Sequence, residues 1–184
     1  MGRLRLMFLP DSEVETGVLR QGDIVSSIHA FGAVNLGAVN CTVIQEGHKV
    51  GYSFANPPDF VDVMVVSHTC EIDTNNRVKV TSVILAPLRD VNKATRPEKI
   101  RELIQSNFVS AGSNYSYLKY FYVESHGRLQ YAAGAVADFS KLFSVRKQSV
   151  DLLVSNKVAQ LNEHAVYEMS LKLALYFHRT QSAE

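Results

Sequence analysis

Two short, fully apolar runs constrain the fold of this chain more than any other feature. They are Val63–Val66 and Val83–Ala86. Valine-rich runs of this length that end in polar or turn residues are typical of buried strands rather than helices. The turn residues are Asp73–Asn76, whose side chains bond their own backbone and tolerate a left-handed conformation. The pattern predicts two neighbouring core strands, whose most buried residues should include Val65, Val66, Ile84 and Leu85.

The rest of the chain adds strands and two helices. Apolar and β-branched stretches predict strands at 19–25, 40–45 and 119–124, a hairpin partner for the last at 129–131, and a bulged strand within 136–145. Residues 26–36 have a mixed pattern and are expected to be irregular. Residues 51–59 are expected to form a loop, because their prolines remove backbone donors and fix φ.

Helix signals are clear at two places. Pro97 stands at a first-turn position and is followed by a one-sided apolar pattern, which predicts a surface helix near 97–104. Asn162 is a good N-cap, and the apolar residues after it recur at helical spacing, so a helix is expected from Glu163 to Arg179. The expected fold class is α+β and mainly β. Its 184 residues suit a single domain, with a sheet core at about 19–145.

Composition excludes several classes of protein. Hydrophobic residues make up 46% and charged residues 20% of the chain, which indicates a globular protein. The net charge is +1, so strong non-specific attraction to nucleic acid is not expected. The two cysteines, Cys41 and Cys70, lack paired spacing and suit a reducing compartment. No apolar run reaches membrane-spanning length and Pro10 ends the first one early, so we expect a cytoplasmic protein with no membrane partner.

Three motifs, taken in order, resemble the PemK/MazF toxin family. They are Gly22–Val25, Val63–Ser67 and Val83–Leu88, within roughly Leu19–Arg89. The resemblance implies a strongly bent, SH3-like antiparallel β-barrel with helices, an RNA-cleaving activity restrained by an antitoxin, and a homodimer. Two positions depart from the family. Val61-Asp62 replaces an Arg-Pro pair, and Arg89 replaces a Thr or Ser. Both family positions support acid–base work, so the resemblance supports the fold more than the activity.

His68-Thr69-Cys70-Glu71 is the richest local group of reactive residues. If the strand continues through it, His68 and Cys70 share one face, and a Cys70 thiolate with His68 as its base is one hypothesis. A zinc site made of these two residues with Cys41 and His48 is a second, although their spacing matches no common site. The simplest interpretation is a buried structural cysteine and a hydrogen-bonded strand-end histidine. We therefore predict no bound metal and no cofactor.

Phosphodiester cleavage without a metal needs a base, an acid and a cation near one phosphate. The residues of suitable type are His29, His68, His126, Arg20, Arg77 and Arg89, with Glu71 or Asp73 as carboxylate. A toxin-like site would use His68 and Glu71 with Arg77 or Arg89. The aromatic stretch that contains Tyr120 and Tyr122, with Lys119 and Arg77, has the composition of a surface that stacks bases.

Three functions follow from these patterns. A binding or interaction module on a toxin-like barrel fits the missing catalytic positions and the near-neutral charge, since a fold does not dictate an activity. A sequence-selective endoribonuclease is the second hypothesis, and an enzyme that depends on His68 and Cys70 is the third. The expected partner is accordingly a protein or an RNA.

Overall fold

The computed structural model describes residues 7–29, 41–46, 49–54, 60–72, 82–109, 117–146 and 149–181. Side chains at 29, 41–46, 49–54, 60, 70–71 and 179–181 are not described. The strands are β1 Asp23–His29, β2 Cys41–Glu46, β3 Lys49–Phe54, β4 Phe60–Val65, β5 Ser82–Asp90, β6 Tyr120–Val123, β7 Ala135–Asp138, β8 Phe143–Arg146 and β9 Lys157–Gln160. The helices are α1 Thr69–Ile72, α2 Val91–Ala94, α3 Ile100–Gln105, α4 Val150–Ser155 and α5 Glu163–Gln181, with short 3₁₀ turns at Pro97–Lys99 (η2) and Phe139–Lys141 (η5).

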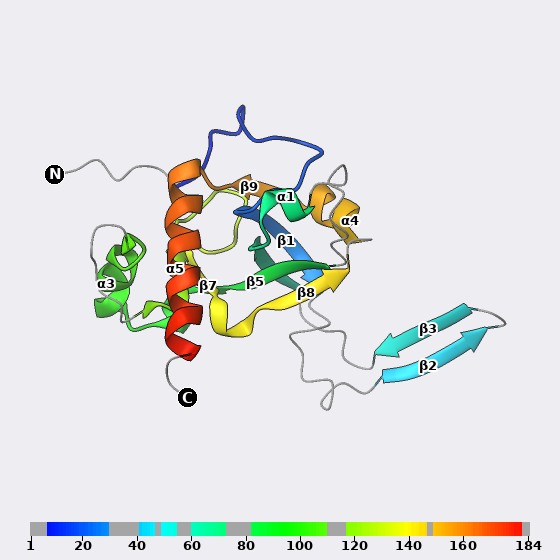
Figure 1. The fold of residues 1–184 in the computed structure, drawn as a ribbon. Coiled ribbons are helices and arrows are strands. Elements are labelled where there is room, and N and C mark those ends of the chain that lie inside the picture. The colour runs from blue at the N-terminus through cyan, green and yellow to red at the C-terminus, as the bar shows by residue number, and fades with distance from the viewer. Residues whose placement is uncertain are drawn as a thin grey trace.

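Seven of these strands form one strongly curled, antiparallel half-barrel (Figure 1). The order along the sheet is β6-β7-β5-β4-β1-β9, and β8 pairs with β5 beside β7. β2 and β3 form a separate hairpin that extends away from the main sheet in Figure 1. The predicted α+β class, with a bent antiparallel sheet, a surface helix and a C-terminal helix, is confirmed.

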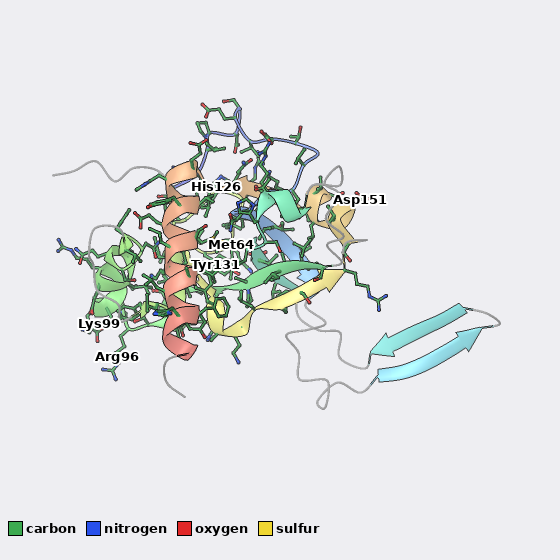
Figure 2. The ribbon with its side chains drawn as sticks, viewed as in Figure 1. Met64, Arg96, Lys99, His126, Tyr131 and Asp151 are labelled. Atoms are coloured by element: carbon green, nitrogen blue, oxygen red, sulfur yellow. The ribbon has the colours of Figure 1, made fainter. Side chains whose placement is uncertain are left out.

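The two apolar runs are the central antiparallel pair, with Val63 opposite Pro87 and Val65 opposite Leu85. Their side chains alternate between two separate cores, one on each face of the sheet. The core beneath α5 takes Met64, Val66, Ala86 and Leu88, together with Ala165 and Met169 of the helix. The opposite core takes Val63, Val65, Val83 and Leu85, together with Leu153 of α4. Because a core lies on each face, most positions of both runs are buried and apolar. Figure 2 shows Met64 among the interior side chains, beside α5 in this view.

The burial prediction is confirmed for three of its four residues. Val65, Val66 and Leu85 are buried, whereas Ile84 is 40% exposed. Ile84 shares a face with Ala86 and Leu88 but lies outside the core beneath α5, and it pairs with the exposed Ser144 of β8. Its backbone is nevertheless fixed, since its N–H donates to Ser67 Oγ at 2.8 Å.

β1 continues to His29, beyond the predicted end at residue 25. Its pairing register with β4 shifts between Val25 and Ile28, and Ser27 there has a φ of 56°. The Ser27 N–H donates to Asp62 Oδ1 at 3.0 Å, which stabilises the irregular turn of the strand. A bulge of this kind lets one strand bend across a curled sheet.

Three other strand predictions were wrong in part. Lys49–Phe54 pairs with β2, so the loop expected from residue 51 cannot begin before residue 55, where the described residues stop. β6 pairs with β7 rather than with residues 129–131, which form no strand. The segment 136–145 is divided by η5 into β7 and β8, and both pair with β5. Local periodicity could not identify these partners, because strand pairing is a non-local choice.

Both helix predictions are confirmed. η2 and α3 span Pro97–Gln105, and α5 begins at Glu163 as expected. The Asn162 side chain caps α5 by accepting the Ala165 N–H at 2.9 Å. In the described part of the chain, no helix is long and apolar enough to cross a membrane.

The edge of β6 is closed by a buried side chain rather than by another strand. The Asn107 amide imitates a neighbouring peptide group: Oδ1 accepts the Tyr122 N–H at 2.9 Å, and Nδ2 donates to the Tyr122 carbonyl at 2.7 Å. The Lys172 ammonium of α5 also donates to Asn107 Oδ1, at 3.3 Å, and to Ser106 Oγ, at 2.8 Å. This cluster joins α5 to the end of α3 and to the edge of the sheet.

Candidate functional site

The reactive segment after β4 packs against the turn that leads into β1. β4 ends at Val65, and α1 begins at Thr69, so the strand does not continue through His68 and Cys70 as the shared-face hypothesis required. Thr69 Oγ1 accepts the Gln21 N–H at 3.2 Å, and Gln21 Nε2 donates to the Val66 carbonyl at 2.9 Å. These bonds leave His68 exposed beside the turn.

Gly22 allows α5 to approach this turn closely. Its φ is 84°, and a Cβ at this position would lie 2.7 Å from Cγ2 of Val166. The Gly22 N–H also donates to the Val65 carbonyl at 2.9 Å. A glycine is therefore needed here both for the backbone conformation and for the contact with the helix.

An open groove of about 940 Å³ lies between the chain leading into β1, the start of α1 and the first turns of α5. We call it the α5 groove. Its lining comprises carboxylates, one arginine, amides, two histidines, an exposed aromatic ring and the apolar side chains of Leu9, Leu161 and Val166, which we call the apolar floor. The charged and aromatic members of the lining include Glu13, Glu15, Arg20, His68, Glu163 and Tyr167. Tyr167 is 57% exposed, and the Arg20 Nε donates to the Glu15 carboxylate.

A buried ion pair holds one wall of the α5 groove. The Lys157 ammonium lies 2.8 Å from Asp23 Oδ2, and both side chains are almost fully enclosed. Lys157 Nζ also donates to the carbonyls of Glu15, at 3.0 Å, and Val18, at 3.3 Å. The buried lysine therefore fixes the path of the segment that carries Glu13 and Glu15.

Burial governs the ionisation of Asp23. Desolvation raises the pKa of this carboxyl to about 6, and it outweighs the opposing effects of the Lys157 ammonium and the Arg20 N–H. Oδ2 accepts the Arg20 N–H at 2.6 Å, whereas Oδ1 has no hydrogen-bond partner among the described residues. Asp23 thus depends strongly on Lys157 for compensation of its charge.

The far end of the same segment is also anchored. The Met7 N–H donates to Glu124 Oε1 at 2.6 Å, and Asp11 pairs with Arg128 at 2.9 Å. The Leu9 N–H donates to the Gln160 carbonyl at 2.9 Å, which places the segment along β9. The wall of the α5 groove formed by this segment is therefore anchored at both of its ends.

The structure separates two of the residues predicted for an RNA-cleaving site, His68 and Arg89. His68 lies in the α5 groove, next to the wall that carries Arg20. Arg89 lies at the opposite end of the β4–β5 ladder, where it pairs with the buried Asp138 at 3.4 Å. It lines a different concavity, of about 300 Å³, with Lys93 and Tyr131. The side chains of Cys70 and Glu71, and the whole of Arg77, lie outside the described residues.

Of the residues predicted to stack bases, Tyr120 and Tyr122 lie on β6 and Lys119 directly precedes it, and the two rings are largely covered. Tyr120 is only 9% exposed and packs with Leu103 of α3, and Tyr122 packs against the same cluster. The Tyr122 hydroxyl donates to the Ala133 carbonyl at 3.2 Å, and Lys119 lies 4.8 Å from the centre of the Tyr120 ring. Base stacking on this strand stays a prediction.

Metal ligation was also predicted to be absent. Among the described residues, no three His, Cys, Asp or Glu side chains gather as a metal site would require. The side chains of Cys41 and Cys70, and the whole of His48, lie outside that set, so the prediction is not tested.

Sequence reasoning missed the buried charges and the outer face of α5. Lys172 follows Ala165 and Met169 at helical spacing, so a lysine on the buried face could have been recognised from the pattern. Glu168 is buried on this same face. Nothing local distinguishes Lys157 or Tyr167, because their roles depend on the segment that crosses over β9.

Comparison with known proteins leaves the family open. No protein-family model matches the sequence, and a search of the curated proteins finds no match. The resemblance to the PemK/MazF family therefore stays a prediction, and the chemistry of the site must be judged from the residues that line the α5 groove.

Proposed function

We propose that this chain is an interaction module on a PemK/MazF-like barrel, and that a segment of a partner protein binds in the α5 groove. The observation that carries the proposal is a large groove, one wall of which is held in place by the buried Asp23–Lys157 pair. A site that is ordered before binding loses little conformational entropy when the partner arrives. On its cysteine usage, we propose that the interaction takes place in the cytoplasm. A homodimer, as in the resembling family, stays a prediction.

Tyr167 is the proposed anchor of the interaction. Tyr167 is 57% exposed and lines the groove together with the apolar side chains of Leu161 and Val166. Exposed aromatic residues beside an apolar floor are typical of the positions that dominate the energy of a protein interface. The polar groups around them can bond to the backbone of an extended segment.

Selection of dodecapeptides from an unbiased random library tests this proposal. We expect peptides with micromolar Kd by fluorescence anisotropy, and Tyr167→Ala should weaken their binding at least about tenfold. Phe177→Ala is the matched control, because it removes a 45% exposed aromatic ring from the other end of the same helix and should leave Kd unchanged. Failure to select any peptide that binds in the groove would contradict the proposal.

Metal-free RNA cleavage is the second candidate, because His68 and Arg20 both line the α5 groove. A histidine and an arginine are suitable as an acid–base group and a cation for a phosphate. The candidate ranks second because Glu15 already neutralises Arg20 and further carboxylates would repel an RNA backbone. A Cys70-dependent enzyme remains a third prediction.

Incubation with mixed RNA, with and without magnesium, separates the first two functions. We expect the RNA to remain intact with both the wild-type protein and His68→Ala, because the groove is a poor site for polyanions. Cleavage by the wild-type protein that His68→Ala abolishes would replace the interaction module with the endoribonuclease.

A further inference from the structure

We propose that the α5 groove selects an extended polypeptide segment that carries lysine or arginine side chains. This inference rests on the proposed function, since it names the chemistry of the partner for that same groove. It follows from the distribution of charge in the groove, from the position of Tyr167 and from the size of the groove.

The charges that line the groove do not cancel. Glu13, Glu15 and Glu163 contribute three carboxylates, and Arg20 contributes the one guanidinium. Arg20 is paired with Glu15. Glu13 and Glu163 are both exposed and have no ion-pair partner among the described residues. Two uncompensated negative charges therefore remain in the groove of a chain whose net charge is +1.

The two unpaired carboxylates come from two different segments that line the groove. Glu13 belongs to the segment that leads into β1, and Glu163 is the first residue of α5. A polypeptide bound in the groove would lie close to both. The N-terminus of α5 contributes a positive partial charge of about half a unit, and the full charge of Glu163 exceeds it.

Tyr167 and the apolar floor suit long cationic side chains. The methylene stem of a lysine or arginine packs on apolar surface while its charged end stays hydrated. Leu161 and Val166 provide such a surface, and the face of the Tyr167 ring can attract the cation. The same groove would repel the phosphates of a nucleic acid, so RNA is the disfavoured occupant.

The size of the groove favours a polypeptide over a small molecule. Its volume of about 940 Å³ is at the upper end of the range for small-molecule sites, and it is open to solvent rather than enclosed. An extended segment can occupy such a groove with several side chains at once. The partner inferred is therefore a basic segment of another protein.

Three fluorescent dodecapeptides that differ only at a fixed set of positions test the charge preference. The basic peptide carries Lys and Arg at these positions, the second peptide carries Gln, and the third carries Glu. We expect the basic peptide to bind the full-length protein about tenfold more tightly than the Gln peptide at low salt, since each exposed pair contributes a few-fold. The Glu peptide should bind most weakly. Added salt should narrow the difference, because exposed charges are screened.

Charge-neutralising variants identify the residues responsible. The double variant Glu13→Gln/Glu163→Gln should reduce the preference for the basic peptide to about twofold or less. Glu98→Gln is the matched control. It lies between Arg96 and Lys99, which Figure 2 shows beside α3 and away from the start of α5, and it should preserve the full preference. Thermal unfolding should be similar for all three proteins.

Different results would overturn the basic-segment inference and the interaction module. If the basic, Gln and Glu peptides bind in the groove with the same affinity, the basic-segment inference is wrong but the interaction module still stands. No peptide binding at all would overturn both. Tighter binding of a mixed 20-nucleotide RNA than of the basic peptide would overturn the inference in favour of a nucleic-acid partner.

Discussion

Substitution of Lys157 by methionine is expected to lower the free energy of unfolding by about 3 to 5 kcal/mol at neutral pH. The variant leaves the Asp23 carboxylate enclosed, with Oδ1 unbonded and its cation removed. It also removes the donor to the carbonyls of Glu15 and Val18. Chemical denaturation at pH 7.5 measures the loss. The wall of the α5 groove should loosen with it, and peptide binding should weaken.

The loss of unfolding free energy in Lys157→Met should be smaller in mild acid. Burial holds the pKa of Asp23 at about 6, above its ordinary 3.8, so the folded state binds more protons than the unfolded state between these values. Stability from this group therefore falls as pH rises from about 4 to 6, and the charged carboxylate costs most above 6. Without Lys157 that cost increases, so the variant should approach the wild type near pH 4.5.

Two further variants isolate the ion pair. The double variant Asp23→Asn/Lys157→Met removes both charges and keeps an acceptor for the Arg20 N–H, so it should recover part of the loss. Lys93→Met changes an exposed lysine and should alter stability by less than about 0.5 kcal/mol. If Lys157→Met has the same free energy of unfolding as the wild type at pH 7.5, the charge of Asp23 is compensated without Lys157, and the prediction is wrong.

Lys172→Met is expected to have the opposite effect and to stabilise the fold by about 2 to 4 kcal/mol at pH 7. Lys172 is fully buried in α5, and desolvation lowers the pKa of its ammonium from 10.5 to about 7. Methionine matches its length without carrying a charge. The two acceptors keep other bonds, because Asn107 Oδ1 still receives the Tyr122 N–H and Ser106 Oγ still donates to Leu103.

The pH dependence distinguishes lost charge from improved packing. Between about pH 7 and 10.5 the unfolded state holds the Lys172 proton more tightly than the folded state, so wild-type stability should rise with pH across this window. In Lys172→Met that rise should disappear, and the two proteins should converge near pH 10. Lys172→Ala should be less stable than Lys172→Met, since it leaves a cavity. A lower free energy of unfolding for Lys172→Met than for the wild type at pH 7 would contradict this prediction. It would indicate that the Lys172 ammonium compensates the charge of the buried Glu168 one turn away.

The candidate site was predictable only in part. His68 was recognised because it follows a core strand, and it does lie in the α5 groove. Its proposed companion Arg89 lies near the end of the other core strand, but the two strands are antiparallel, so their ends lie at opposite edges of the sheet. Arg20 was named from the sequence among the residues of suitable type for phosphodiester cleavage, and it lines the same groove as His68. Tyr167 and Glu163 were read only as parts of a helix.

What the sequence alone determined is the pair of central strands and the two helices. Valine runs that must be buried on both faces, Asn162 as a cap and Pro97 in a first turn are local signals with a direct physical cause. They predicted these elements and the α+β class. Pairing of β6 with β7, and of β7 and β8 with β5, brings together residues far apart in the chain, and no local pattern encodes that choice.

Only the tertiary structure decided the groove and the fate of the buried charges. Residues 9–21 pass over β9 and meet the start of α5, and this crossing creates the α5 groove from two segments about 150 residues apart. The same crossing encloses Lys157 against Asp23, and the packing of α5 on the end of α3 encloses Lys172. A lysine in a sequence is expected to be at the surface because burial of its charge is costly. The acceptors that compensate that cost are brought to it only when the chain has folded.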